Sequence, residues 1–75
     1  MKKKENFRYE IVEHIATLST SGDCSKELNL VSYNGAEPKY DLRSWRRLDG
    51  SEQLLKGLTL NAEEMETLKE AINAL

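Results

Sequence analysis

The sequence predicts an α+β domain in which four strands are followed by one C-terminal helix. Three observations support this class. Runs of aromatic and β-branched residues are separated by turn sequences, the dipeptides Asn34-Gly35 and Asp49-Gly50 are typical of hairpins, and Asn61 begins a well-marked helix. At 75 residues the chain makes one domain at most. We expect a flexible basic arm over residues 1–6 and a single domain over 7–75.

The first strand is predicted over residues 7–18, where Phe7, Tyr9 and Ile11 alternate onto one face. The alternation loses its phase after this point, and a bulge or strong twist near Ile11 and Val12 would explain the loss. A helix is the competing interpretation of residues 10–18, since Ile11, Ile15 and Leu18 also fit a helical stripe. The abundance of Phe, Tyr, Ile, Val and Thr favours a strand.

Further strands are predicted over residues 26–33, 39–46 and, as a short element, 57–60. In the third strand the two sets of alternating residues differ in character. One set is Tyr40, Leu42 and Ser44, and the other is Lys39, Asp41, Arg43 and Trp45. If the first set points inward, the second lies on an open sheet face, because one helix can cover only part of one face of a four-stranded sheet.

The helix is predicted from its start. Asn61 is an N-cap residue and Glu64 completes a capping box in outline, while Leu60 and Met65 are placed to form a hydrophobic staple. An apolar stripe at helical spacing follows, made of Met65, Leu68, Ile72 and Leu75.

Composition narrows the possible classes of protein. Cys24 is the only cysteine and His14 the only histidine, so a disulfide within the chain is excluded and a zinc site is not expected. Small domains that lack such links often gain a sufficient core by oligomerising, so we expect a homodimer, without a cofactor or metal. No apolar run is long enough to span a membrane and no signal peptide is recognisable, so we expect a cytoplasmic protein.

The charge pattern leaves a nucleic-acid-binding function open. The net charge is −2, but residues 61–75 hold four acids against one base, so the acidic excess is confined to the C-terminal segment. The helix would repel a phosphate backbone, which argues against a duplex-reading helix. No arrangement of nucleophile, base and carboxylate and no phosphate-binding glycine loop is present, so an enzyme acting on a small-molecule substrate is not expected.

A Trp beside Arg and Lys on an open strand has the chemistry for binding single strands, because bases stack on aromatic rings and cations bind the phosphates. Composition and phase alone leave a second interpretation open, in which Trp45 fills the core and Arg43 pairs with Asp41 at the surface. The same alternative applies to Tyr33, and Lys2 to Lys4 are equally consistent with a solubilising tail.

Two ordered motifs resemble a known family. Asp41-Leu42-Arg43-Ser44-Trp45, followed by Lys56-Gly57-Leu58-Thr59-Leu60-Asn61 and an acidic helix, is similar to the transcriptional positive cofactor four family of single-stranded-DNA-binding coactivators, especially its short bacterial members. The stretch from Lys26 to Asp41 also fits, and the resemblance runs from about residue 7 to residue 75.

The resemblance implies a curved antiparallel sheet, a homodimer packed through the helices, and single-stranded DNA crossing the sheets. RNA is a second candidate ligand of the same surface. The nucleic-acid-binding residues that it implies, together with strand phase, are Lys26, Asn29, Tyr33, Lys39, Arg43, Trp45, Lys56 and Gly57. The implied dimer interface is the helical stripe Met65, Leu68, Ile72 and Leu75. The expected role is transcription regulation or DNA maintenance. A protein-interaction module that uses the open face and the acidic helix is the alternative.

Overall fold

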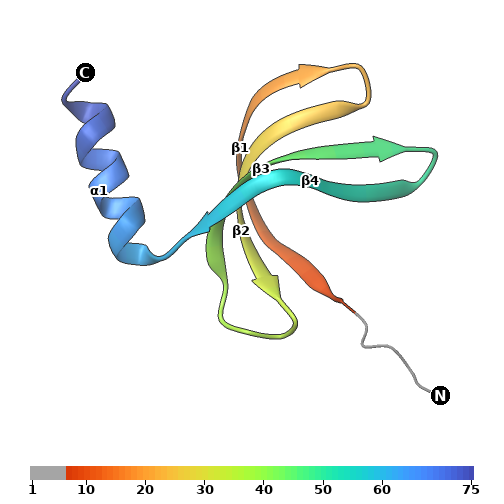
Figure 1. Cartoon of the computed structure of the whole chain (residues 1–75), viewed down its shortest axis with the longest axis horizontal. Helices are drawn as coiled ribbons and strands as arrows, with labels where there is room; N and C mark the ends of the chain where they lie inside the picture. The colour runs from red at the N-terminus through yellow and green to blue at the C-terminus, as the bar shows by residue number, and fades with distance from the viewer. Residues whose placement is uncertain (1–6) are drawn as a thin grey trace.

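The computed structural model describes residues 7–75, and the predicted basic arm lies outside this range. Four antiparallel strands are hydrogen-bonded in chain order and are followed by one helix (Figure 1). The elements are β1 (Tyr9–Ser21), β2 (Cys24–Tyr33), β3 (Lys39–Leu48), β4 (Ser51–Leu60) and α1 (Ala62–Asn73). The predicted fold class, an antiparallel sheet with a C-terminal helix, is therefore confirmed.

The strands are longer than the sequence predicts, and the turns explain why. Asn34 and Gly35 have φ values of 52° and 78°, and Asp49 and Gly50 have values of 50° and 79°, so each pair turns the chain tightly in the left-handed region. The Asp49-Gly50 turn joins β3 and β4 directly. Because of this turn β4 begins at Ser51 and has 10 residues, instead of the short strand predicted from residue 57.

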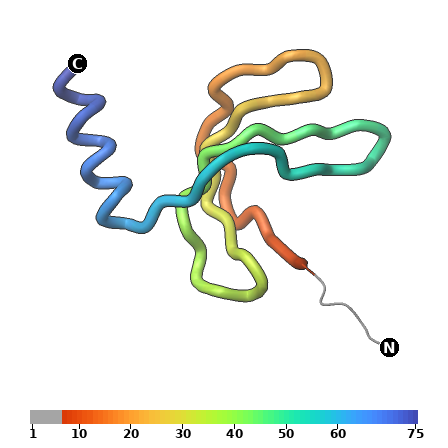
Figure 2. The backbone as a smooth tube through the Cα atoms, viewed as in Figure 1, coloured from red at the N-terminus to blue at the C-terminus, as the bar shows by residue number. Residues whose placement is uncertain are grey.

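Irregularities in strand pairing curve the sheet. The predicted bulge near Ile11 and Val12 is confirmed, and β1 has two more, at His14/Ala16 and Thr17/Ser19. A fourth register shift lies between β3 and β4, at Arg43/Trp45. Each bulge bends its strand and increases the local twist. The strands consequently bend through the middle of the sheet, and the β1–β2 and β3–β4 hairpins separate at one end (Figure 2).

One face of the curved sheet forms the core. Cross-strand partners place Val31, Asn29 and Glu27 of β2 beside Lys39, Asp41 and Arg43 of β3, with Trp45 further along. Val31, Asn29, Asp41 and Trp45 are 0% exposed, although the sheet is a single layer. Curvature and neighbouring side chains bury them, and we call this side the concave face. The prediction that Asp41 and Trp45 face solvent is wrong, because phase alone does not show how strongly the sheet bends.

The other side, the convex face, carries most of the leucines. Leu28 pairs with Leu42, and Leu42 pairs with Leu58, so the three lie side by side across the sheet. Leu28 and Leu42 are only half-buried and Leu58 is 52% exposed. Tyr40, predicted to point inward with Leu42, is also half-buried on this face. The convex face is therefore apolar and incompletely covered in the single chain.

The helix begins as predicted but packs little against the sheet. Glu64 N–H donates to Asn61 Oδ1 at 2.7 Å and Asn61 N–H donates to Glu64 Oε1 at 2.9 Å, which is a complete capping box. α1 projects to one side of the sheet (Figure 1) and has no buried residue. Met65 and Leu68 are half-buried, whereas Ile72 is 55% exposed. In the described part of the chain, no helix is long and apolar enough to cross a membrane.

Candidate nucleic-acid interface

The structure divides the predicted binding residues between the two faces. Tyr33, Lys39 and Arg43 belong to the concave face, together with the buried Asn29 and Trp45. Lys26 pairs with Ser44, next to the Leu28–Leu42 pair, and therefore lies on the convex face. A single open surface containing all the predicted residues does not exist in the single chain.

Arg43 is fixed by a carboxylate on its own strand. Its Nε donates to Asp41 Oδ1 at 2.7 Å, its Nη2 donates to Asp41 Oδ2 at 2.8 Å, and its Nη1 donates to the Leu55 carbonyl at 3.0 Å. The Tyr33 hydroxyl donates to the same carboxylate at 2.6 Å. Asp41 therefore orients both Arg43 and Tyr33, and it is fully buried while doing so.

This arrangement changes the acid–base properties of its members. Burial, reinforced by the hydrogen bond to Asp41, raises the pKa of Tyr33 to about 12. The hydrogen bonds to Asp41 raise the pKa of Arg43, so its charge is retained. The Arg43 guanidinium lies 5.9 Å from the centre of the Tyr33 ring. Arg43 presents a fixed cation with part of its donor capacity still unused.

Gly57 is required by packing against Arg43. A Cβ at this position would overlap the Cβ of Arg43 and lie 2.6 Å from its Cα, because the two residues are cross-strand partners at the bulge. In the motif Lys56-Gly57 the glycine thus allows β3 and β4 to approach closely. Lys56, the charged member of the motif, is exposed and is available for a ligand.

A second hydrogen-bond network crosses the concave face around Arg47. The position of this residue in the sheet could not be predicted from the sequence. Arg47 Nη1 donates to Glu27 Oε2 and its Nε donates to Glu52 Oε2, both at 2.7 Å. Asn29 Nδ2 donates to Glu27 Oε1 at 3.0 Å, and Asn29 Oδ1 lies 2.6 Å from His14 Nδ1. The hydrogen bond from Arg47 lowers the pKa of Glu27 to about 2. Asn29 is part of this buried network and is not exposed to a ligand.

Trp45 lies beneath the second network. The Tyr9 ring is 5.6 Å from the Trp45 ring and the Arg47 guanidinium is 5.2 Å from it. The Tyr9 hydroxyl donates to Glu52 at 2.6 Å, which holds this cover in place and raises the pKa of Tyr9 to about 12. A base has no access to the buried indole. The prediction that Trp45 is an exposed stacking residue is therefore wrong, and its core interpretation is correct.

The exposed aromatic ring is Phe7. It is 62% exposed and lies 5.9 Å from Tyr33 and 6.0 Å from Tyr9, measured between ring centres. Phe7, Tyr9, Tyr33 and Trp45 form one aromatic cluster on the concave side. Alternation placed Phe7 with Tyr9 and Ile11 on one face and did not show that the Phe7 ring is exposed. Phe7 lies just before β1, next to Arg8.

Three lysines of the sheet have no carboxylate partner within the described residues: Lys26, Lys39 and Lys56. By contrast Arg46 is paired with Asp23 at 3.3 Å and Lys69 of the helix with Glu66 at 3.9 Å. Lys39 and Lys56 are exposed: Lys39 lies on β3 four residues before Arg43, and Lys56 lies on β4 next to Gly57, the partner of Arg43. Residues 7–75 contain no group of three or more His, Cys, Asp or Glu placed to hold a metal.

Comparison with known proteins identifies the family. The family model for the transcriptional coactivator p15 (PC4) matches residues 23–71, which include β2, β3, β4 and most of α1. The chain belongs to the PC4 family. The resemblance predicted from Asp41–Trp45 and Lys56–Asn61 is thereby confirmed. The PC4 family consists of nucleic-acid-binding proteins that are not enzymes, and its name describes transcriptional coactivators.

A relative of similar size matches almost the whole chain. It is an uncharacterized protein from Treponema pallidum (strain Nichols), 38% identical over 72 residues, which cover 95% of this chain and 82% of the relative. The similarity therefore includes β1, which lies entirely outside the part matched to the PC4 family.

Proposed function

We propose that this chain is a homodimeric, sequence-tolerant binder of single-stranded DNA, and also of RNA, that acts in transcription regulation or DNA maintenance. Membership of the PC4 family supports this class of ligand. The observation that carries the proposal to particular residues is the presence of two exposed cations without carboxylate partners near the fixed Arg43: Lys39 on the same strand, and Lys56 next to Gly57, the β4 partner of Arg43. These residues bind the phosphates.

The structure supports a single strand rather than a duplex. Exposed aromatic surface at Phe7 and Tyr33 lies beside Arg43, and unpaired bases stack on such rings in a sequence-tolerant way. The helix carries Glu63 and Glu64 in its first turn and no base in its last, so it cannot approach a phosphate backbone favourably. Trp45 and Asn29 support the surface from below and do not contact the ligand.

The uncovered apolar surface supports the homodimer. The convex leucines and the helical stripe Met65, Leu68, Ile72 and Leu75 together expose more apolar area than a stable small domain normally leaves in water. In the dimer this stripe forms the contact between subunits, and the two sheets then present one continuous binding surface.

The test is charge reversal at the two free lysines. The double variant Lys39→Glu with Lys56→Glu should weaken binding of a fluorescein-labelled oligo-dT by at least ~30-fold at low salt, measured by fluorescence anisotropy, because two phosphate contacts become repulsive. Lys69→Glu, which alters a lysine of the helix, is the matched control and should bind as the wild type does. Unchanged affinity in the double variant, with the fold intact by circular dichroism, contradicts the proposal. Arg43 is not changed in this test, because without it the buried carboxylate of Asp41 would lose its charged partner.

A further inference from the structure

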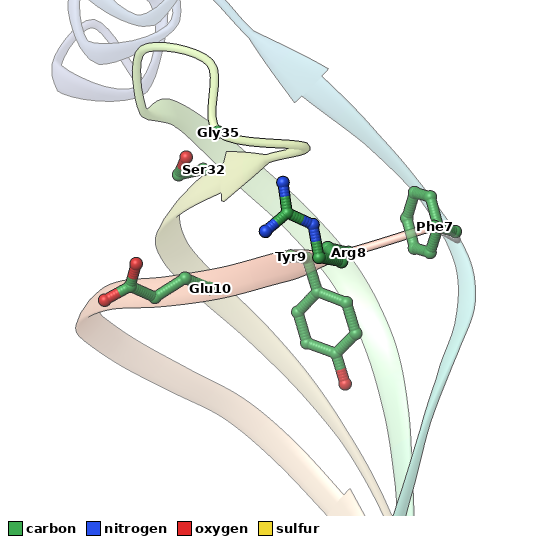
Figure 3. Close-up of a pocket in the computed structure, with 6 residues that line it drawn as sticks. All are labelled: Phe7, Arg8, Tyr9, Glu10, Ser32 and Gly35. Atoms are coloured by element: carbon green, nitrogen blue, oxygen red, sulfur yellow. The ribbon is translucent and has the colours of Figure 1, made fainter. Parts of the chain in front are cut away.

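A hollow of about 410 Å³ lies where β1 begins, beside the loop between β2 and β3 (Figure 3). Two hydrogen bonds join these segments: Arg8 N–H donates to Asn34 Oδ1 at 2.9 Å, and Asn34 N–H donates to the Arg8 carbonyl at 2.8 Å. The start of the strand is thus held against the loop, and the hollow is a fixed feature of the surface. Its lining residues are Phe7, Arg8, Tyr9, Glu10, Ser32 and Gly35.

Arg8 is the cation of this hollow. Its side chain points toward Ser32 and the loop, away from the Tyr9 ring on the other side of the strand (Figure 3). Within residues 7–75 its guanidinium has no carboxylate within 4.0 Å and makes no hydrogen bond, whereas Arg43, Arg46 and Arg47 are all paired. The donors of Arg8 are therefore available to a phosphate.

Phe7 also lines the hollow, but its ring lies on the Tyr9 side of the strand, opposite to the Arg8 guanidinium. Its ring is held against Tyr33 and Tyr9 and is still 62% exposed. A ring fixed in this way loses little conformational entropy when a base stacks on it. Glu10 also lines the hollow but is not paired with Arg8, so its carboxylate opposes an incoming phosphate.

We propose that the chain segment at this hollow is a subsite for one nucleotide of a single strand that passes around the edge of the sheet, with the base stacked on Phe7 on one side and the adjoining phosphate bound by Arg8 on the other. The subsite rests on the proposed function and extends it to residues outside the family-model match, since Phe7 and Arg8 precede the matched residues 23–71. It lengthens the path of the strand from the Lys39–Arg43 region, past Tyr33, to the start of β1.

The test distinguishes stacking of a base on Phe7 from binding of a phosphate by Arg8. A labelled oligo-dT and an abasic oligodeoxynucleotide of the same length, which has phosphates but no bases, are titrated against each variant under the same low salt. Phe7→Leu should weaken binding of oligo-dT at least ~5-fold and leave the abasic strand unaffected. Phe7→Trp should tighten oligo-dT binding. Arg8→Gln should weaken both strands about 5-fold, and Glu10→Gln should tighten both about 2-fold.

Two controls match these changes. Leu48→Ala removes an exposed apolar side chain at the far hairpin, and Lys69→Gln removes a positive charge from the helix; both should bind as the wild type does. The subsite is overturned if the Phe7 and Arg8 variants match these controls, or if Phe7→Leu weakens both strands equally. Wild-type protein that fails to bind oligo-dT overturns the proposed function and the subsite together, whereas binding with unaffected variants overturns the subsite alone.

Discussion

The two faces of this sheet use opposite chemistry. The concave face buries two carboxylates, an asparagine and a tryptophan, whereas the convex face leaves much of its leucine surface exposed. In an ordinary two-layer domain the apolar face would be the inner one. Here curvature makes the polar face the core of the single chain. The difference leaves the convex face without a covering layer in the single chain, and the proposed dimer would supply one.

The concave face tolerates its buried charges because each carboxylate has several donors. Asp41 accepts hydrogen bonds from Arg43 and Tyr33, and Glu27 accepts them from Arg47, Ser25 and Asn29. A buried ion pair with its remaining lone pairs satisfied is compatible with a stable fold, whereas removing one partner is costly. The following predictions test each face in turn, from the largest effect to the smallest.

The largest effect is expected at the apolar stripe of α1, which the proposed dimer would cover. Ile72→Asp places a charge in the proposed dimer contact, and because Ile72 is 55% exposed in the single chain, the fold of the subunit should survive. We expect monomers at concentrations at which the wild type is dimeric, measured by analytical ultracentrifugation. Thr67→Asp, off the apolar stripe of the same helix, should remain dimeric. A folded dimer of the Ile72 variant, or a monomeric wild type, would show that the helical stripe is not the interface.

The next prediction compares a concave tryptophan with an exposed leucine. Trp45→Ala should lower the free energy of unfolding by about 3–5 kcal/mol, because it empties a fully buried site. Leu48→Ala, at the exposed hairpin, should change it by no more than ~0.5 kcal/mol. Urea unfolding measures both. Equal small losses would place Trp45 outside the core, and strong quenching of its fluorescence by acrylamide would do the same.

A third prediction isolates Asp41. Asp41→Asn should cost about 3 kcal/mol of stability, since Arg43 then keeps its charge without a partner. The pKa of Tyr33 should also fall from about 12 toward 10, although burial keeps part of the rise. Absorbance titration at alkaline pH follows the tyrosinates, with Tyr33→Phe as the control that removes this group. A Tyr33 pKa unaltered in the Asp41 variant would mean that the carboxylate does not act on it.

The smallest effect concerns pH. The pKa of Glu27 is lowered from 4.5 to about 2, so its ion pair contributes stability that is complete above about pH 4.5 and is lost as pH falls toward 2. Glu27→Gln should therefore show a flatter stability profile in this window than the wild type. The free energy of unfolding, measured at several acidic pH values, gives the comparison. Parallel profiles for the two proteins would exclude Glu27 as a source of the acid dependence.

Local features of this fold could be predicted from sequence, and long-range ones could not. The helix start at Asn61 and the turns at Asn34-Gly35 and Asp49-Gly50 depend on residues close in the chain, and they are where they were expected. The curvature depends on register shifts between strands. One of the three bulges in β1 was predicted, because it lies where the apolar alternation is lost. The other two lie beyond that point, where no alternation remains from which a further shift could be recognised.

The same contrast between local and long-range features applies to the binding site. The motifs around Arg43 and Gly57 identified the family and the correct strands. Whether Trp45 is covered depends on Tyr9 and Arg47, which come from distant parts of the chain. Phe7 lies just before β1, and its exposure depends on which of the residues 7–75 pack beside it. Neither fact is contained in the alternation of one strand.

The central claim is that the curved sheet binds single strands, and one titration tests it most directly. Single-stranded DNA, RNA and duplex DNA of the same sequence and length are added to the wild-type protein under identical salt. Both single strands should bind, and the duplex should bind at least ~10-fold more weakly. Affinity should fall as salt is raised, because phosphate contacts release counterions. Binding of the duplex as tightly as the single strands, or no binding of any of the three at micromolar protein, would contradict it.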